Sequence, residues 1–98
     1  MIIDNSILVD SLIRNLRENK FSYPSHMAVN VYLTSFNLWG APKEVKVNAA
    51  KDIEKCDKDE RLLSAIDRWS DGRVIKPKIM TKVSDDGLID VNLLFITK

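Results

Sequence analysis

Two β-favouring runs at the C-terminal end of the sequence constrain the fold more than any other feature. They are R-V-I-K-P-K-I-M-T-K-V and L-I-D-V-N-L-L-F-I-T-K, and S-D-D-G lies between them. This pattern predicts an antiparallel β-hairpin. In a three-residue loop of Asp85, Asp86 and Gly87, the glycine supplies the left-handed residue that such a loop requires, and Ser84 then faces Leu88.

The loop length decides which residues face each other across the hairpin. Counting outward from a three-residue loop places Val83 opposite Ile89 on one face and Lys82 opposite Asp90 on the other. A two-residue loop would place Val83 opposite Asp90, so the alternation of apolar and polar residues favours the three-residue loop. The other expected pairs are Thr81 with Val91, Ile79 with Leu93, Pro77 with Phe95, and Met80 with Asn92.

Length and composition predict one globular α+β domain over residues 1–98. Hydrophobic residues make up 45% of the chain and charged residues 30%, as in ordinary folded domains. The net charge of +1 is too small for a strongly basic nucleic-acid binder, so any charge-based function must be local. With one cysteine, no basic apolar leader in M-I-I-D-N-S and no long uncharged apolar run, we expect a cytoplasmic protein without a membrane span.

The first half of the chain predicts one amphipathic helix and one ambiguous element. The helix runs from about Asp4 to Lys20 and has Asn19 as its C-terminal cap. The segment from Met27 to Trp39 is rich in β-branched and aromatic residues, which favours a strand, but Ser25 is a suitable helix N-cap. We expect a helix there, with a strand as the alternative. The apolar stripe of the first helix is Leu8, Val9, Leu12, Ile13 and Leu16, and its N-cap candidates are Asp4, Asn5 and Ser6.

The middle of the chain predicts a short strand and two helices. Glu44 to Val47 can form the strand, and Asn48 can cap the helix that follows. Asp57 with Glu60 has the spacing of a capping box, which predicts that a second helix begins at Asp57 and ends before Gly72. The alternative is one continuous helix over residues 48–70. The inward positions are Ala49, Ile53 and Cys56 in the first helix, and Leu62, Leu63, Ile66 and Trp69 in the second.

The residues that could support catalysis do not form a recognisable site. His26 has no second His or Cys at metal-ligand spacing, and Cys56 lies beside acidic residues that disfavour a reactive thiolate. The three glycines are dispersed, which argues against a phosphate-binding loop, and the acidic residues between Asp52 and Glu60 are interleaved with cations. We therefore expect a protein that is not an enzyme and that has no metal, no cofactor and no small-molecule substrate.

Two short helices followed by a β-hairpin is also the order of a winged-helix domain. The stretch N-A-A-K-D-I-E-K-C-D-K-D-E-R-L-L-S-A-I-D-R-W-S-D-G-R-V-I-K resembles the helix-turn-helix and first wing strand of that superfamily, and V-S-D-D-G-L-I-D-V-N-L-L-F-I-T-K resembles the wing tip and return strand. The resemblance implies a regulator that binds duplex DNA through a recognition helix from Lys58 to Ser70. Lysines that alternate on a hairpin also protect it from aggregation, which is their alternative role. The expected DNA-contacting residues, including the basic wing, are Lys58, Arg61, Ser64, Arg68, Arg73, Lys76, Lys78 and Lys82.

A protein-interaction domain, such as an immunity protein, an adaptor or a phage-encoded antagonist, is the alternative function. A DNA binder needs the cations of the third helix and of the hairpin on one continuous face, whereas a protein binder should expose an aromatic or apolar patch. If Met27 to Trp39 is a strand, the winged-helix interpretation fails and protein interaction becomes the leading class. Candidate protein-binding residues are Phe21, Tyr23 and Trp39, and a second copy in a homodimer could cover Leu94 and Ile96.

Overall fold

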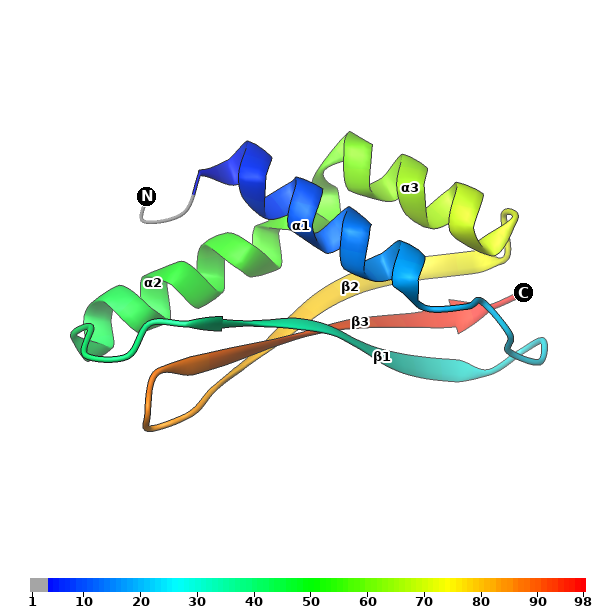
Figure 1. Ribbon diagram of the computed structural model, residues 1–98. Helices are drawn as coiled ribbons and strands as arrows, with labels where there is room; N and C mark the ends of the chain where they lie inside the picture. The colour runs from blue at the N-terminus through cyan, green and yellow to red at the C-terminus, as the bar shows by residue number, and fades with distance from the viewer. Residues whose placement is uncertain (1–3) are drawn as a thin grey trace.

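The chain folds into two layers, a three-stranded antiparallel sheet and three helices that cover one of its faces (Figure 1). The computed structural model describes residues 4–98. The strands lie in the order β1-β3-β2, so the last strand is the central one. The predicted α+β class is confirmed. The elements are α1 (Asn5–Glu18), β1 (Ala28–Asn37), α2 (Lys43–Glu54), the 3-10 helix η1 (Lys55–Lys58), α3 (Glu60–Ser70), β2 (Val74–Val83) and β3 (Leu88–Thr97).

The C-terminal hairpin forms as the sequence predicts. Val83 pairs with Ile89 and Lys82 with Asp90, as expected for a three-residue loop. Gly87 has a φ of +91°, and the N–H of Ser84 donates to the carbonyl of Leu88 at 2.9 Å. The hydroxyl of Ser84 also donates to Asp86 and lowers the pKa of that carboxyl.

A bulge in β2 changes the hairpin at the end far from its loop. The regular register shifts between Ile75 and Lys78, so the expected pair of Pro77 with Phe95 does not form. Lys76 adopts a left-handed φ of 54° at this bulge. The regular register would place Val74 on the outer face, but the inserted residue reverses which side chains face the core, so Val74 packs against it.

The segment from Met27 to Trp39 is a strand, and the expected helix was wrong. Nine of the ten residues of β1 pair with residues of β3, and the strand buries Val31 and Leu33. Their β-branched and aromatic side chains suit this half-buried position, so strand propensity outweighed the N-cap signal at Ser25. A bulge between Tyr32 and Thr34 keeps both ends of the strand in register with β3.

The middle of the chain departs from the predicted boundaries. Glu44 to Val47 is not a strand but the start of α2, which has Pro42 at its N-cap position in place of Asn48. The capping residue of α3 is Asp59, whose side chain accepts from the N–H of Arg61, and not Asp57. A run of four residues was too short to compete as a strand, because helical spacing buries Ala49, Ala50 and Ile53 against the sheet.

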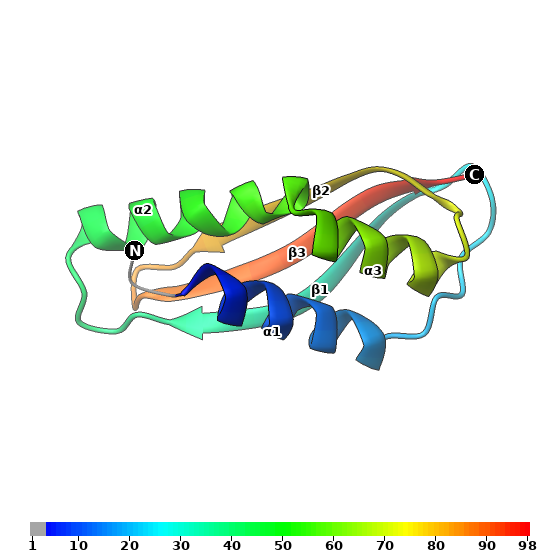
Figure 2. The same cartoon turned by 90° about the horizontal axis from the view of Figure 1, so that it is seen from above.

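The arrangement of α2 and α3 is not that of a typical winged helix. Figure 2 shows that the two helices follow one another along the sheet, with only the turn of η1 between them. A helix-turn-helix places its second helix across the first, where it can enter a groove. Here α3 lies beside α1 in the helical layer (Figure 2). Because η1 separates α2 from α3, the prediction of two helices is confirmed and the alternative of one continuous helix is wrong.

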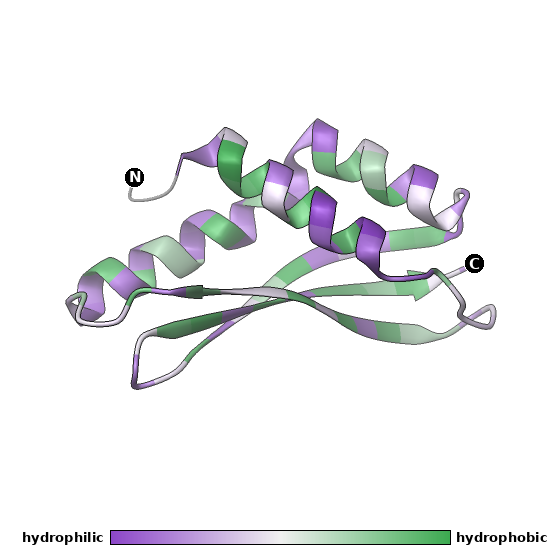
Figure 3. Ribbon diagram, viewed as in Figure 1, coloured by the Kyte–Doolittle hydropathy of each residue, from purple (hydrophilic) through white to green (hydrophobic). Residues whose placement is uncertain are grey.

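One hydrophobic core lies between the two layers. Four of the five inward side chains that the sequence predicts for α1 are confirmed, since Leu8, Val9, Leu12 and Leu16 are fully buried. The fifth, Ile13, is only partly buried. Hydrophobic residues recur along all three strands (Figure 3), and the central strand contributes alternate residues to the core. The buried hydrophobic residues of the sheet are Val31, Leu33, Ile79, Ile89, Val91, Leu93 and Phe95.

Candidate functional site

The sheet face opposite the helices is uncovered and carries a mixture of apolar, polar and basic side chains. Tyr32 of β1 is 54% exposed, and Met80 and Ile96 are also exposed large apolar residues on this side. A hydrogen bond of 2.7 Å from Asn92 to Asn30 crosses between the strands. The face therefore offers apolar contact area together with polar groups that are already oriented.

A short hydrogen-bonded chain fixes the exposed tyrosine. The hydroxyls of Tyr32 and Ser35 contact each other, and the Ser35 hydroxyl donates to the carboxylate of Asp90 at 2.6 Å. Because the strand bulge lies between Tyr32 and Thr34, this chain ties the bulged part of β1 to β3. The tyrosine ring is thus held in place before any partner binds, which lowers the entropy cost of contacting it.

The outer edge of β2 is blocked by two carboxylates. The backbone N–H and hydroxyl of Thr81 both donate to Glu54, at 3.2 and 2.9 Å. The N–H of Ile79 donates to Asp57 at 3.4 Å. These amides point away from β3, and side chains from the end of α2 and from η1 occupy the place where another strand would pair.

The outer edge of β1 has no such cover. Within residues 4–98 no side chain forms a hydrogen bond with a backbone group on the outer side of this strand. The N–H of Thr97 donates to the carbonyl of Met27, and the N–H of Leu38 donates to the carbonyl of Gly87. These two bonds fix which residues of β1 bond to β3 and which alternate residues turn their backbone groups outward. By that alternation the backbone groups that face outward belong to Ala28, Asn30, Tyr32, Ser35 and Asn37.

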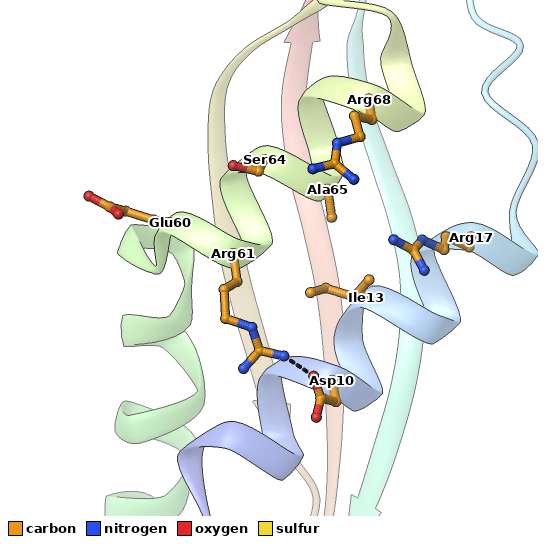
Figure 4. Close-up of a pocket in the computed structure, with 8 residues that line it drawn as sticks. All are labelled: Asp10, Ile13, Arg17, Glu60, Arg61, Ser64, Ala65 and Arg68. Carbon is orange, nitrogen blue, oxygen red and sulfur yellow. Dashed lines mark hydrogen bonds and ion pairs between the residues drawn. The ribbon is translucent and has the colours of Figure 1, made fainter.

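A cleft of about 540 Å³ lies between α1 and α3 on the helical side of the molecule (Figure 4). Arg61 forms an ion pair with Asp10 across it. Arg17 and Arg68 extend into the same space from the two helices, while Glu60 points away. The cleft is lined by Asp10, Ile13, Arg17, Glu60, Arg61, Ser64, Ala65 and Arg68.

The residues predicted to contact DNA are divided between two sides of the molecule. Arg61, Ser64 and Arg68 lie in the helical layer, in or beside the cleft, and Lys58 is exposed at the end of η1. Lys78 and Lys82 pair with Leu94 and Asp90 on the open face of the sheet. The two groups do not form one continuous basic face, which is what the DNA interpretation required. DNA binding stays a prediction.

Arg73 and two of the three predicted protein-binding residues have structural roles. Phe21 and Tyr23 pack edge to face, with ring centroids 5.1 Å apart, and both contact Trp69 and Phe95. The guanidinium of Arg73 lies 5.3 Å from the Phe21 ring and donates to the carbonyl of Tyr23 at 3.0 Å. This cluster joins the loop after α1 to the core.

Trp39 is the predicted protein-binding residue that lies at the surface. It is 80% exposed, and its backbone N–H donates to the side chain of Asn37 at 2.9 Å. Tyr32, Arg17 and the open edge of β1 were not predicted from the sequence. The alternation in A-V-N-V-Y-L could have revealed Tyr32, had the segment been assigned as a strand.

The groups that could support catalysis do not converge. Burial raises the pKa of the Cys56 thiol from 9.0 to about 11, and the nearby carboxylates, first Asp59, add to that rise. His26 is exposed, in a left-handed backbone conformation. In the described part of the chain, no three His, Cys, Asp or Glu side chains gather to hold a metal ion. Among residues 4–98 no helix is long and apolar enough to cross a membrane.

The fold and these surfaces define the chain as a small α+β domain with one open sheet face. Neither a protein-family model, nor a curated protein, nor a solved structure matches it. Function therefore has to be inferred from the surfaces themselves.

Proposed function

We propose that the chain is a non-enzymatic protein-interaction module that binds an extended segment of a partner protein as a fourth strand beside β1. The observation that carries this proposal is the difference between the two edges of the sheet. The edge of β2 is occupied by Glu54 and Asp57, whereas that of β1 presents its backbone donors and acceptors. An extended peptide satisfies such groups by adding a strand to the sheet.

The composition of β1 also supports strand addition. Its sequence, A-V-N-V-Y-L-T-S-F-N, has no charged residue and no proline, the two devices that commonly protect an edge strand. Exposed apolar side chains lie along it and just beyond its ends. Met27 is 44% exposed, and Tyr32 and Trp39 are exposed as well. We expect these three side chains to select partners by apolar contact, while the backbone supplies most of the affinity.

The position of α1 would cover one side of the bound segment. In Figure 1 α1 lies above β1, and in Figure 2 its C-terminal half extends past the outer side of that strand. A segment paired with β1 would lie in the plane of the sheet, about 4.8 Å from β1. It would then lie below this half of α1. The side chains of the partner would alternate, with one set turned towards α1 and the other set turned to the open face beside Tyr32.

A selection from a displayed random-peptide library tests the proposal, with affinities then measured by fluorescence anisotropy. Asn30→Pro removes an outward N–H of β1 without breaking a backbone hydrogen bond to β3, so it should weaken the selected peptides about tenfold or more. Lys82→Ala, on the same face but in β2, is the matched control and should leave their affinity unchanged.

Hydrogen exchange provides the second measurement for this test. On peptide binding, the amides of Asn30 and Tyr32 should exchange more slowly, because they become bonded to the added strand. Peptides that bind wild type and Asn30→Pro equally, with no new protection in β1, would overturn strand addition.

The competing proposal is a regulator that binds duplex DNA without a typical winged-helix fold. The exposed lysines 76, 78 and 82 support it, because a basic hairpin suits phosphate contact. If it is correct, binding to generic duplex DNA should weaken steeply with salt, and the slope should become shallower by about one unit for each phosphate-contacting lysine changed to Ala. Because the cations lie on two sides of the molecule, we expect weak binding to DNA. We also expect little change in the salt dependence when lysines 76, 78 and 82 are all changed to Ala.

A further inference from the structure

We propose that the cleft between α1 and α3 is a binding site for a phosphate monoester, held between Arg17 and Arg68. This site lies in the helical layer and does not depend on strand addition at β1. Its basis is the way in which charged side chains face each other across the two neighbouring helices (Figure 4).

The two helices place equivalent residues side by side at a constant offset along the chain. Asp10 of α1 contacts Arg61 of α3. Seven residues further along each helix come Arg17 and Arg68, and a step of seven residues, close to two helical turns, returns to the same helix face. The facing sides of α1 and α3 therefore carry a pair of opposite charges and, two turns later, a pair of like charges.

The second pair has no carboxylate to balance it inside the cleft. The acidic residues that line the cleft are Asp10, which is bonded to Arg61, and Glu60, which points outward in Figure 4. A cation in the last turn of each helix is favoured by the helix dipole, but the dipole does not require both side chains to enter one cleft. Two converging guanidinium groups repel each other unless an anion lies between them.

The chemistry of the cleft identifies the class of anion. A guanidinium group donates two parallel hydrogen bonds to phosphate oxygens, and two such groups match the charge of a phosphate monoester, which is close to −2. Ser64 also lines the cleft, but in Figure 4 its hydroxyl points away from the two guanidinium groups. The volume of about 540 Å³ exceeds what a bare phosphate needs, and Ile13 and Ala65 provide an apolar part for the organic group of the ester.

NMR titration of the whole chain at constant ionic strength tests this site. The probes are inorganic phosphate, O-phosphoserine and adenosine 5′-monophosphate, with sodium chloride as the ionic control. We expect saturable shifts confined to α1 and α3, and tighter binding of the two esters than of inorganic phosphate. The difference between the two esters tells whether the cleft prefers an amino acid or a nucleoside as the organic group.

Three variants make the titration decisive. Arg17→Gln and Arg68→Gln should each weaken ester binding about tenfold or more, as expected when a charge-assisted hydrogen-bond pair is lost. Arg14→Gln, also exposed on α1, should bind like wild type. All three positions are exposed, so the variants should keep the wild-type melting temperature. Equal shifts with chloride, equal affinities in all variants, or binding of duplex DNA without binding of the esters would overturn the proposal.

Discussion

The two outer strands of the sheet have the same length, but the backbone groups on their outer edges differ in whether they are hydrogen-bonded. β2 and β1 each contain ten residues and each pairs with β3. On β2, the carboxylates of Glu54 and Asp57 accept hydrogen bonds from the outward amides of Thr81 and Ile79. On β1, the outward backbone groups have no partner among the described residues. The comparison shows that a sheet edge can be closed by two side chains of a neighbouring helical segment, without another strand.

The location of α2 and η1 is the physical cause of this difference. These elements lie along β2, so their carboxylates reach its amides, whereas α1 contacts β1 from the helical layer and provides no such acceptor. A closed edge resists pairing with other chains, and an open edge invites it. Among the described residues, the edge of β1 therefore leaves its outward backbone groups free for such pairing.

Gly87→Ala should have the largest effect on stability, because it disturbs the attachment of β1 to the hairpin. A Cβ at this position would lie 2.9 Å from the carbonyl oxygen of Leu38, and the residue also has a left-handed φ. We expect the free energy of unfolding to fall by about 1–3 kcal/mol, measured by urea denaturation.

Gly40→Ala is the matched control for this prediction. Gly40 has a φ of +81°, but a Cβ added there would meet nothing within 4 Å, so only the backbone strain remains. If both variants lose the same stability, the close approach of Leu38 to Gly87 has no energetic role.

Glu54→Ala should have the next largest effect, because it opens the closed edge. The loss of two charge-assisted hydrogen bonds to Thr81 should cost about 1–2 kcal/mol in urea denaturation. The exposed edge should also increase self-association in analytical ultracentrifugation. Glu44→Ala, in the first turn of the same helix, is the control. A variant as stable and as monodisperse as that control would show that the edge of β2 is not protected by Glu54.

Cys56 lies between Glu54 and Asp57 and can report on the closed edge. Its folded-state pKa of about 11 exceeds the 9.0 of an exposed thiol, so the neutral thiol stabilises the fold below pH 9, and this contribution is lost between pH 9 and 11. Alkylation by iodoacetamide near pH 8.5 should therefore be much slower in the folded than in the urea-unfolded protein. Glu54→Ala should accelerate it, and equal folded and unfolded rates would contradict the burial of this thiol.

Asn30→Pro should have the smallest effect on stability although it should strongly weaken strand addition. The outward N–H of Asn30 bonds to nothing in β3, so the variant loses only the exposed hydrogen bond from Asn92. We expect a change of less than about 1 kcal/mol in urea denaturation. A much larger loss would mean that this amide belongs to the β1–β3 ladder, and the open-edge assignment would be wrong.

Local patterns were sufficient to predict the elements whose signals agree with each other. In α1 the N-cap Asp4, the C-cap Asn19 and the spacing of the buried leucines all indicate the same helix. In the hairpin, Gly87 and the alternation of Lys82 and Val83 indicate the same register. Where signals conflicted, as between Ser25 and the β-branched residues after it, the outcome depended on pairing with β3, which lies some sixty residues further along the chain.

The candidate sites were less predictable than the elements. The sequence predicts Arg61, Ser64 and Arg68 as binding residues, but Arg17 joins them only because α1 lies beside α3. The winged-helix resemblance predicts the lysines of β2 on the same surface as these arginines, but the sheet separates them. Side-chain spacing within one element predicts which residues share a face, but not which faces of two elements meet.

Residues close together in the chain were enough to specify the amphipathic helix α1, the three-residue hairpin loop and the absence of charge along β1. Three other features came only from the packing of the folded chain: β1 pairs with β3, Glu54 closes the edge of β2, and Arg17 faces Arg68 across a cleft. The physical reason is that such contacts join distant segments. Their free energy comes from burying the common core, which no single segment encodes.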